Sequence, residues 1–174
     1  MDLLRHLSPG QWCSFWDDEG DEDFRVGYLL GSNADFSLFA LVTTRGYDDG
    51  CYLTPTTCIT RIDISDRYTN RIEKLFSMQK QEKRPILENA DVLTDAWFCA
   101  KAKSRGELVS AYLETGETIS GFISGWTEET VTFARIDEEG REDGISAISW
   151  DTIIKLRSDS GDERILLSLY RGEL

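Results

Sequence analysis

The side chains best suited to nucleophilic or metal chemistry are four cysteines and a single histidine: Cys13, Cys51, Cys58, Cys99 and His6. No two cysteines have the C-x-x-C spacing that zinc sites commonly use, and the histidine lies in a short predicted turn near the N-terminus. The sequence also contains no secretory signal and no apolar run long enough to cross a membrane, so it predicts free thiols in a reducing cytoplasm. We expect no metal and no cofactor.

Carboxylates are the most numerous reactive groups, and two adjacent pairs, Asp48–Asp49 and Glu142–Asp143, could in principle act as acid and base. Both pairs fall in predicted hairpin turns, where water keeps carboxylates ionised, whereas a catalytic acid needs a raised pKa. The run DDEGDED at residues 17–23 offers oxygen ligands for calcium but lacks the order of an EF-hand loop, and it equally suits a solvated turn. No hydrolase, P-loop or dinucleotide-binding motif is present, so we expect a protein that is not an enzyme.

Cations and aromatic rings are the groups that would hold a nucleic acid, and the cations are unevenly distributed. The net charge is −13: residues 1–64 carry 4 Lys or Arg against 11 Asp or Glu, residues 107–174 carry 6 against 15, and only residues 65–106 are basic, with 9 against 6. An acidic body disfavours RNA and favours solubility or a basic protein partner. The groups that could still contact RNA or another partner are Phe36, Trp126, Lys80, Lys83, Arg84, Lys101, Lys103 and Arg105.

The elements that carry these groups repeat along the chain with an offset of 94 residues. Residues 27–59 align with residues 121–153 without a gap, and eight of the 33 positions are identical, where chance would give roughly two. The repeat predicts two small domains, residues 1–64 and 107–174, on either side of a helical connector at residues 65–106. The identical pairs are Gly27/Gly121, Gly31/Gly125, Phe39/Phe133, Ala40/Ala134, Gly46/Gly140, Asp49/Asp143, Gly50/Gly144 and Ile59/Ile153.

Each copy predicts five short strands. Gly27 and Gly121 lie inside a strand, where a missing side chain allows a sharp bend or a bulge. Gly50 and Gly144 belong to hairpin loops that need a positive φ. Short strands, a bend and short loops predict a bent sheet that closes into a small barrel in each copy, in a fold that is mainly β and of the α+β kind. In the first copy the expected strands are residues 11–16, 24–31, 36–43, 51–54 and 58–64.

The period changes to that of a helix between the copies and again at the C-terminus. A first connector helix is predicted from residue 68 to 76, with Asn70 and Glu73 as a capping pair. A second helix, ended by Gly106, is predicted from an apolar stripe of Ile86, Ala90, Leu93, Trp97 and Ala100. Both helices are expected to cover or join the barrels. The capping-box spacing at residues 160–163 favours a helix over residues 165–170, although a buried strand would show the same apolar run.

The glycine and strand pattern resembles that of a known family. The second copy contains V-S-x-Y-L at residues 109–113, I-x-G-x-I at 119–123, V-x-F at 131–133 and A-I-S at 147–149, and the first copy contains G-x-L at 27–29. In these motifs the chain resembles Sm-like proteins, particularly the bacterial Hfq branch. The resemblance implies a bent five-stranded barrel with a helix on its open face, often assembled as a ring that binds uridine-rich or adenine-rich RNA.

The chain departs from that family where RNA is bound. Ile145 and Ser146 occupy the place of a Lys-His pair in the Hfq pattern, and no arginine of an Sm-type R-G-N turn occurs at residues 54–57 or 149–152. We therefore expect a cytoplasmic, non-catalytic protein-interaction or scaffold module. The alternative is Sm-like RNA binding through the basic connector and the barrel aromatics. The sequence leaves the oligomeric state open.

Overall fold

A computed structural model describes residues 3–17 and 24–173 and divides the chain into two compact units, one ending at Leu93 and one beginning at Thr94. This boundary lies inside the predicted connector 65–106, because its first helix packs on strands of the first unit and its second helix on strands of the second. Most of the acidic run considered for calcium, residues 18–23, lies outside the described residues. Each unit is mainly β, with antiparallel strands and packed helices.

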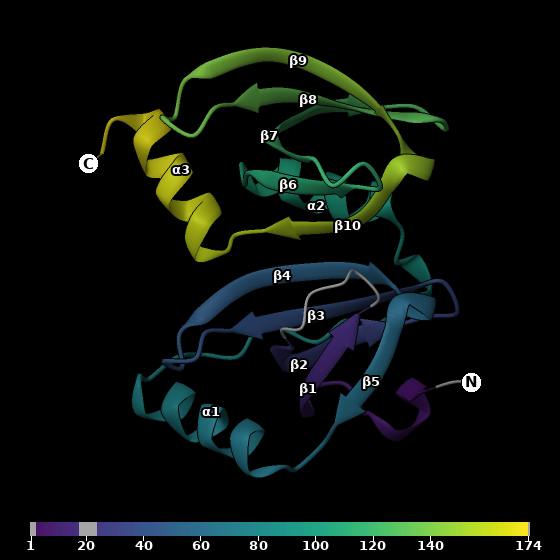
Figure 1. Ribbon diagram of the computed structural model, residues 1–174, viewed down its shortest axis with the longest axis vertical. Helices are drawn as coiled ribbons and strands as arrows, with labels where there is room; N and C mark the ends of the chain where they lie inside the picture. The colour runs from purple at the N-terminus through teal and green to yellow at the C-terminus, as the bar shows by residue number, and fades with distance from the viewer. Residues whose placement is uncertain (1–2, 18–23, 174) are drawn as a thin grey trace. The chain divides into compact units, whose positions relative to one another are not determined.

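The first unit is built on five strands in the order β5-β1-β2-β3-β4, each antiparallel to its neighbour (Figure 1). Its core is aromatic: Phe15 and Phe39 stack with ring centroids 4.1 Å apart, and Tyr52 packs beside them. The 3-10 helix η1 (Leu3–His6) precedes the sheet, and η2 (Thr56–Cys58) joins its last two strands. The strands are β1 (Trp12–Asp17), β2 (Arg25–Ser32), β3 (Phe36–Val42), β4 (Asp48–Pro55) and β5 (Ile59–Asp63).

The second unit has the same strand order in its own numbering, β10-β6-β7-β8-β9. Its buried side chains are mainly aliphatic and include Val109, Ile123 and Leu156, together with Phe133. The 3-10 helix η4 (Trp150–Thr152) stands between β9 and β10, as η2 does between β4 and β5. The strands are β6 (Val109–Leu113), β7 (Thr118–Trp126), β8 (Thr130–Ile136), β9 (Glu142–Ser149) and β10 (Ile153–Ser158).

Gly27 and Gly121 occupy the same place in the two sheets for a steric reason. A β-carbon would lie 1.9 Å from the carbonyl oxygen of Ala40 at the first site and 2.2 Å from that of Ala134 at the second. The close approach of neighbouring strands therefore requires glycine. The register shift comes a few residues later, between Leu29 and Gly31 in β2 and at the matching place in β7, where it adds to the bend.

The two glycines predicted in hairpin loops have the expected positive φ, but their predicted place in a loop is wrong. Gly50 has a φ of 84° and Gly144 a φ of 80°, values that glycine adopts without a steric penalty. Both lie inside a strand, because β4 and β9 begin two residues before them. In the described residues β4 is not paired with β5, nor β9 with β10, so strand pairing does not close either sheet into a barrel.

Helix α1 (Arg67–Met78) follows β5 and buries Ile72 and Phe76 against the first sheet. The predicted capping pair Asn70 and Glu73 is wrong. The N-cap is Asp66, whose side chain accepts the first free backbone N–H groups of the helix, and this leaves Asn70 and Glu73 inside it. An aspartate satisfies this position well because its carboxylate reaches N–H groups that lack an intrahelical partner.

The predicted helix starting at Ile86 is also wrong in its first half. The chain from Gln81 to Asn89 is an extended strap across the first sheet, followed only by the 3-10 helix η3 (Ala90–Val92). The backbone N–H of Arg84 donates to the Tyr28 hydroxyl at 2.7 Å, and that of Leu87 donates to the Leu30 carbonyl at 3.0 Å. These bonds and Pro85, which disfavours helical geometry at Arg84, outweigh the helical period.

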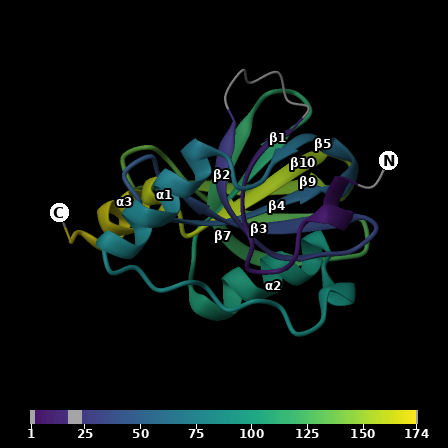
Figure 2. The ribbon, with the colours of Figure 1, turned by 90° about the horizontal axis from the view of Figure 1, so that it is seen from below.

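The two remaining helices start and end at clear caps. Helix α2 (Asp95–Arg105, labelled in Figure 2) has Thr94 as its N-cap and Gly106, with a φ of 66°, as its C-cap. It packs on β7 and β10. Helix α3 (Gly161–Arg171) confirms the prediction for the C-terminal apolar run. Its capping box is formed by Ser160 and Glu163.

Each unit ties its C-terminal helix to its first strand through a buried polar contact at the same position. In the first unit the Ser14 hydroxyl of β1 lies 2.7 Å from the Thr69 hydroxyl of α1. In the second unit the Ser110 hydroxyl of β6 donates to the Glu163 carboxylate of α3 at 2.6 Å. Thr69 and Glu163 are 94 residues apart and both lie in the first turn of their helix. We call these contacts the helix anchors.

Candidate binding surfaces

Strand β9 is the most exposed strand of the second unit. It ends the strand order, so in the described part of the chain β8 is its only strand partner. Of its side chains only that of Ile148 is buried, whereas Ile145 is 73% exposed. A register shift and the positive φ of Gly144 separate the acidic start of β9 from the rest of the strand. Beyond the shift, Ile145 and Ala147 lie on one face, opposite to that of Ile148. That face therefore presents two apolar side chains just beyond the acidic start of the strand.

The hairpin before β9 is held by arginines rather than left loose. Arg135 of β8 donates two hydrogen bonds, of 2.9 and 2.7 Å, to the carbonyl oxygen of Asp143, and pairs with its carboxylate at 3.0 Å. The backbone N–H of Arg141 donates to Asp137, which lowers the pKa of that carboxyl, and the Arg141 side chain pairs with it as well. These bonds fix where β9 begins.

Two of the predicted RNA contacts, Lys83 and Arg84, hold the strap in place. The Arg84 guanidinium donates two hydrogen bonds of 2.6 Å to the Asp48 carboxylate, and both side chains are largely buried. Lys83 donates to the carbonyl of Gly10 at 3.0 Å, and its ammonium lies 5.4 Å from the Trp12 ring centroid. Their charge serves the first unit itself.

Two of the predicted cations on α2 are also engaged by groups of their own unit. Arg105 lies 3.7 Å from Glu107, and the Lys101 ammonium lies 5.8 Å from the ring centroid of Trp97 on the same helix. Lys80 is exposed just after α1, with a φ of 54°. Lys80 belongs to the first unit, whereas the α2 cations belong to the second.

Lys103 and Trp126 form the one predicted cation–aromatic combination that the structure assembles at an exposed site. The Lys103 ammonium lies 5.9 Å from the Trp126 ring centroid and donates to the carbonyl of Ser124. Trp126 is 41% exposed at the end of β7. A nucleobase could stack on such a ring.

Phe36 belongs to the first unit and is half-buried at the start of β3. Its backbone N–H donates to the Asn33 side chain at 2.7 Å, while the Asn33 amide group donates to the carbonyls of Ala90 and Leu93. A pocket of about 550 Å³ lies beside this turn, lined by residues 32–34, 56–57, Leu4 and Arg5. Arg5 is the only cation among the residues that line this pocket.

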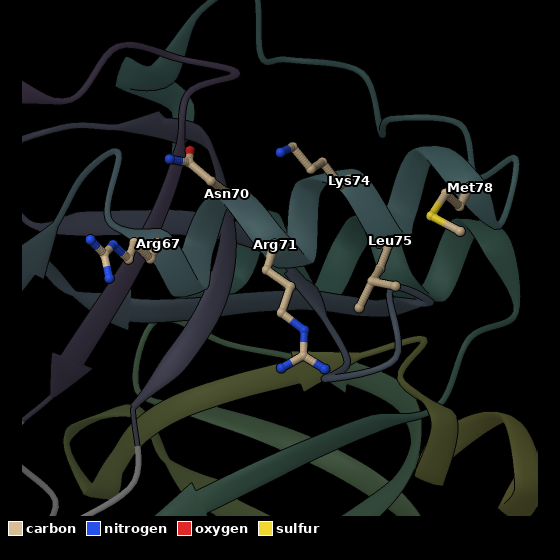
Figure 3. Close-up of a pocket in the computed structure, with 6 residues that line it drawn as sticks. All are labelled: Arg67, Asn70, Arg71, Lys74, Leu75 and Met78. Carbon is tan, nitrogen blue, oxygen red and sulfur yellow. The ribbon is translucent and has the colours of Figure 1, made fainter.

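Three cations outside the predicted set line the outer face of α1: Arg67, Arg71 and Lys74 (Figure 3). All three are exposed and follow one another at steps of four and three residues. The helical period of the segment contains this signal, because the three cations repeat at helical spacing on the side opposite the apolar positions.

None of the four cysteines, all of which lie in the described residues, forms a disulfide. Burial raises the pKa of both Cys13 and Cys99 to about 12, which removes the thiolate that reactive cysteines use. Across residues 3–17 and 24–173 there is no group of three or more His, Cys, Asp or Glu side chains placed to hold a metal ion. In the same residues, no helix combines the length and apolar character required to span a bilayer.

Comparisons with known proteins give no relative. No protein-family profile, curated protein or solved structure matches this chain.

Proposed function

We propose that this chain is a non-catalytic protein-interaction module whose main binding element is the outer edge of β9. The observation that carries the proposal is Ile145, which is 73% exposed in the middle of an end strand. An end strand offers backbone N–H and C=O groups to an incoming strand, and proteins normally protect such edges with charge, proline or a covering element. Here the protective charge is confined to the first two residues of β9.

The chemistry of the edge defines the partner. An added strand would pair its backbone with β9 and place alternate side chains over Ile145 and Ala147. Glu142 and Asp143 at the start of the strand favour a lysine or arginine at the matching end of the partner. The proposed partner is thus an extended segment with alternating apolar residues and one basic end, in keeping with the acidic body of the chain.

A pair of matched substitutions tests this proposal. Ile145→Lys places a charge on the edge, whereas Ile165→Lys changes an isoleucine of α3 that is 58% exposed and leaves the edge intact. Affinity purification from the native lysate should recover the same partner with the unchanged chain and Ile165→Lys, and lose it with Ile145→Lys. Amide exchange in β9 should slow when the purified partner is added. Equal recovery with both variants would contradict the proposal.

We further propose that both units are Sm-like domains and that the chain works in the cytoplasm. The shared strand order, the required glycines Gly27 and Gly121, and a helix packed on each sheet support the first part; the free thiols support the second. Light scattering tests whether the resemblance extends to assembly. A mass of several chains that falls to one chain in Ile145→Lys would identify the β9 partner as another copy.

RNA binding is the second candidate, and the Lys103–Trp126 contact is the observation in its favour. Against it, Arg84 and Arg105 are paired with acids of their own units. Filter binding with a random RNA pool distinguishes RNA binding from a protein-interaction function. Retention at low salt that is lost in Trp126→Ala would support RNA binding, and no retention at low salt would eliminate it.

A further inference from the structure

The outer face of α1 is a second surface with its own chemistry, independent of the β9 edge. Thr69, Ile72 and Phe76 turn toward the sheet, which leaves Arg67, Arg71, Lys74 and Met78 on the opposite side of the helix (Figure 3). Met78 is 75% exposed. We refer to these four residues as the α1 stripe.

The charge of the α1 stripe is unbalanced. Among the described residues no carboxylate forms an ion pair with Arg67, Arg71 or Lys74. The one acid of the helix, Glu73, is half-buried and lies toward the flank of the packed face. Three neighbouring cations repel one another, so their presence on one face of a chain of net charge −13 favours an anionic partner.

The stripe also has an apolar floor. A shallow groove of about 460 Å³ is lined by the stripe together with Asn70 and Leu75. Leu75 and Met78 supply hydrocarbon surface, and the stems of the arginines and the lysine add to it while their charged ends stay in water. None of the residues that line the groove is aromatic. A partner would therefore gain both ion pairs and apolar contact.

We propose that the α1 stripe docks an acidic, partly apolar segment of another protein, with carboxylates at helical spacing facing the three cations. Seven residues of helix separate Arg67 from Lys74, which is about 10 Å, comparable to the distance of about 8 Å over which physiological salt screens charge. A short segment with about three acids matches a stripe of this length. A nucleic acid would extend beyond it into the acidic field of the chain, and it would find no aromatic ring in the groove for its bases.

Helix α3 shows that the stripe is not a by-product of the repeated fold. The matching positions, 94 residues later, are Gly161, Ile165 and Ser168 in α3 and Gly172 at its C-cap. The helix anchor is kept in both units, whereas cations occupy these positions only in α1. The fold therefore does not need them.

The test uses the full chain and a defined probe. The probe is a labelled peptide of about 12 residues with glutamates at i, i+4 and i+7 and leucines between them; the same peptide with glutamines is its control. Fluorescence anisotropy compares the unchanged chain with the triple variant Arg67→Gln, Arg71→Gln, Lys74→Gln. The matched variant, Lys101→Gln, Lys103→Gln, Arg105→Gln on α2, removes the same charge elsewhere. Circular dichroism verifies that both variants keep their helices.

We expect the glutamate peptide to bind, with an affinity that falls about tenfold or more in the α1 variant and stays within about threefold in the α2 variant. Binding should also weaken as salt is added. Met78→Ser should weaken binding of the glutamate peptide without changing the salt dependence of that binding, because the substitution removes only apolar contact. No binding at low salt, or equal losses in the two triple variants, would overturn the proposal. Tighter binding of a labelled oligouridine that is lost only in the α1 variant would assign the stripe to nucleic acid and overturn it too.

Discussion

Gly121 shows how much of this fold depends on the absence of one side chain. Its neighbour strand approaches so closely that a β-carbon would lie 2.2 Å from the carbonyl oxygen of Ala134. Backbone cannot move aside as a flexible side chain can, so the clash would spread into the pairing of β7 with β8. The same contact exists at Gly27, which is why the two glycines are identical in the repeat.

We predict that Gly121→Ala destabilises the chain by about 3 kcal/mol or more. Gly125→Ala is the matched control, because nothing lies within 4 Å of a β-carbon there, and it should change stability by less than about 1 kcal/mol. The midpoint of urea unfolding measures both. Similar midpoints for the two variants would show that the close approach in the structure is wrong.

Asp95 is a residue whose behaviour only the tertiary structure reveals. It lies in the first turn of α2, where the helix dipole normally stabilises an ionised carboxylate. Burial nevertheless raises its pKa from 3.8 to about 6. The folded state therefore binds the Asp95 proton more tightly than the unfolded state does. The stability gained from the protonated side chain is fully present below the unfolded pKa of 3.8 and is lost as the pH rises through the folded pKa of about 6.

The variant Asp95→Asn should reveal this titration. Between pH 4 and pH 7 we expect the unfolding free energy of the unchanged chain to fall relative to that of the variant by about 2 kcal/mol. Other carboxylates titrate equally in both proteins and cancel in the difference. Chemical unfolding at a series of pH values measures it. A difference that is flat, or that grows with pH, would mean that Asp95 is ionised and solvated.

At the scale of elements, the helix anchors are the features that the two units share most closely. Glu163 completes the capping box of α3 and at the same time accepts a 2.6 Å hydrogen bond from Ser110 on β6. The residue is only 4% exposed. A buried carboxylate that loses a hydrogen bond is costly, so one side chain couples the start of the helix to the sheet.

Ser110→Ala should therefore cost about 1–3 kcal/mol and speed amide exchange along α3 more than in the strands. Ser104→Ala, which removes an exposed hydroxyl bonded only to the carbonyl of Lys101, is the control and should have little effect. Hydrogen exchange followed by mass spectrometry resolves the two regions. Uniform acceleration across the second unit would argue against a local anchor.

At the scale of the whole molecule, the net charge of −13 sets a background against which every surface acts. Excess like charge weakens a compact state through self-repulsion. Several ion pairs join near neighbours in the chain, such as Arg141 with Asp137 and Arg164 with Asp159. They do not offset this excess of acids.

We predict that raising sodium chloride from about 20 to 200 mM increases the thermal unfolding midpoint by a few degrees, because salt screens repulsion among exposed acids. Differential scanning fluorimetry measures the shift. Exposed ion pairs would instead be weakened by salt, so a midpoint that falls would show that they contribute more than the self-repulsion removes.

The parts of the fold that could be predicted from sequence are those fixed by local rules. The strands, the positive φ of Gly50 and Gly144 and the C-terminal helix all follow from turn chemistry and period. The strap could not be predicted, because its hydrogen bonds reach Tyr28 and Leu30 more than fifty residues away. The β9 edge depends on which strand ends a sheet, which is a tertiary property. The α1 stripe could have been found from the sequence, because its cations follow one another at helical spacing opposite the apolar positions.

The strap also determines where the first unit can be cut. A chain ended after Met78 would retain all five strands and α1, and a boundary drawn from these elements alone would place the cut there. A cut after Met78 would remove the two hydrogen bonds from Arg84 to Asp48 and the bond from the Arg84 backbone to the Tyr28 hydroxyl. It would also remove the Leu87 side chain that covers Gly31. A fragment that keeps these contacts and the whole compact unit therefore extends to Leu93, fifteen residues beyond its last α-helix.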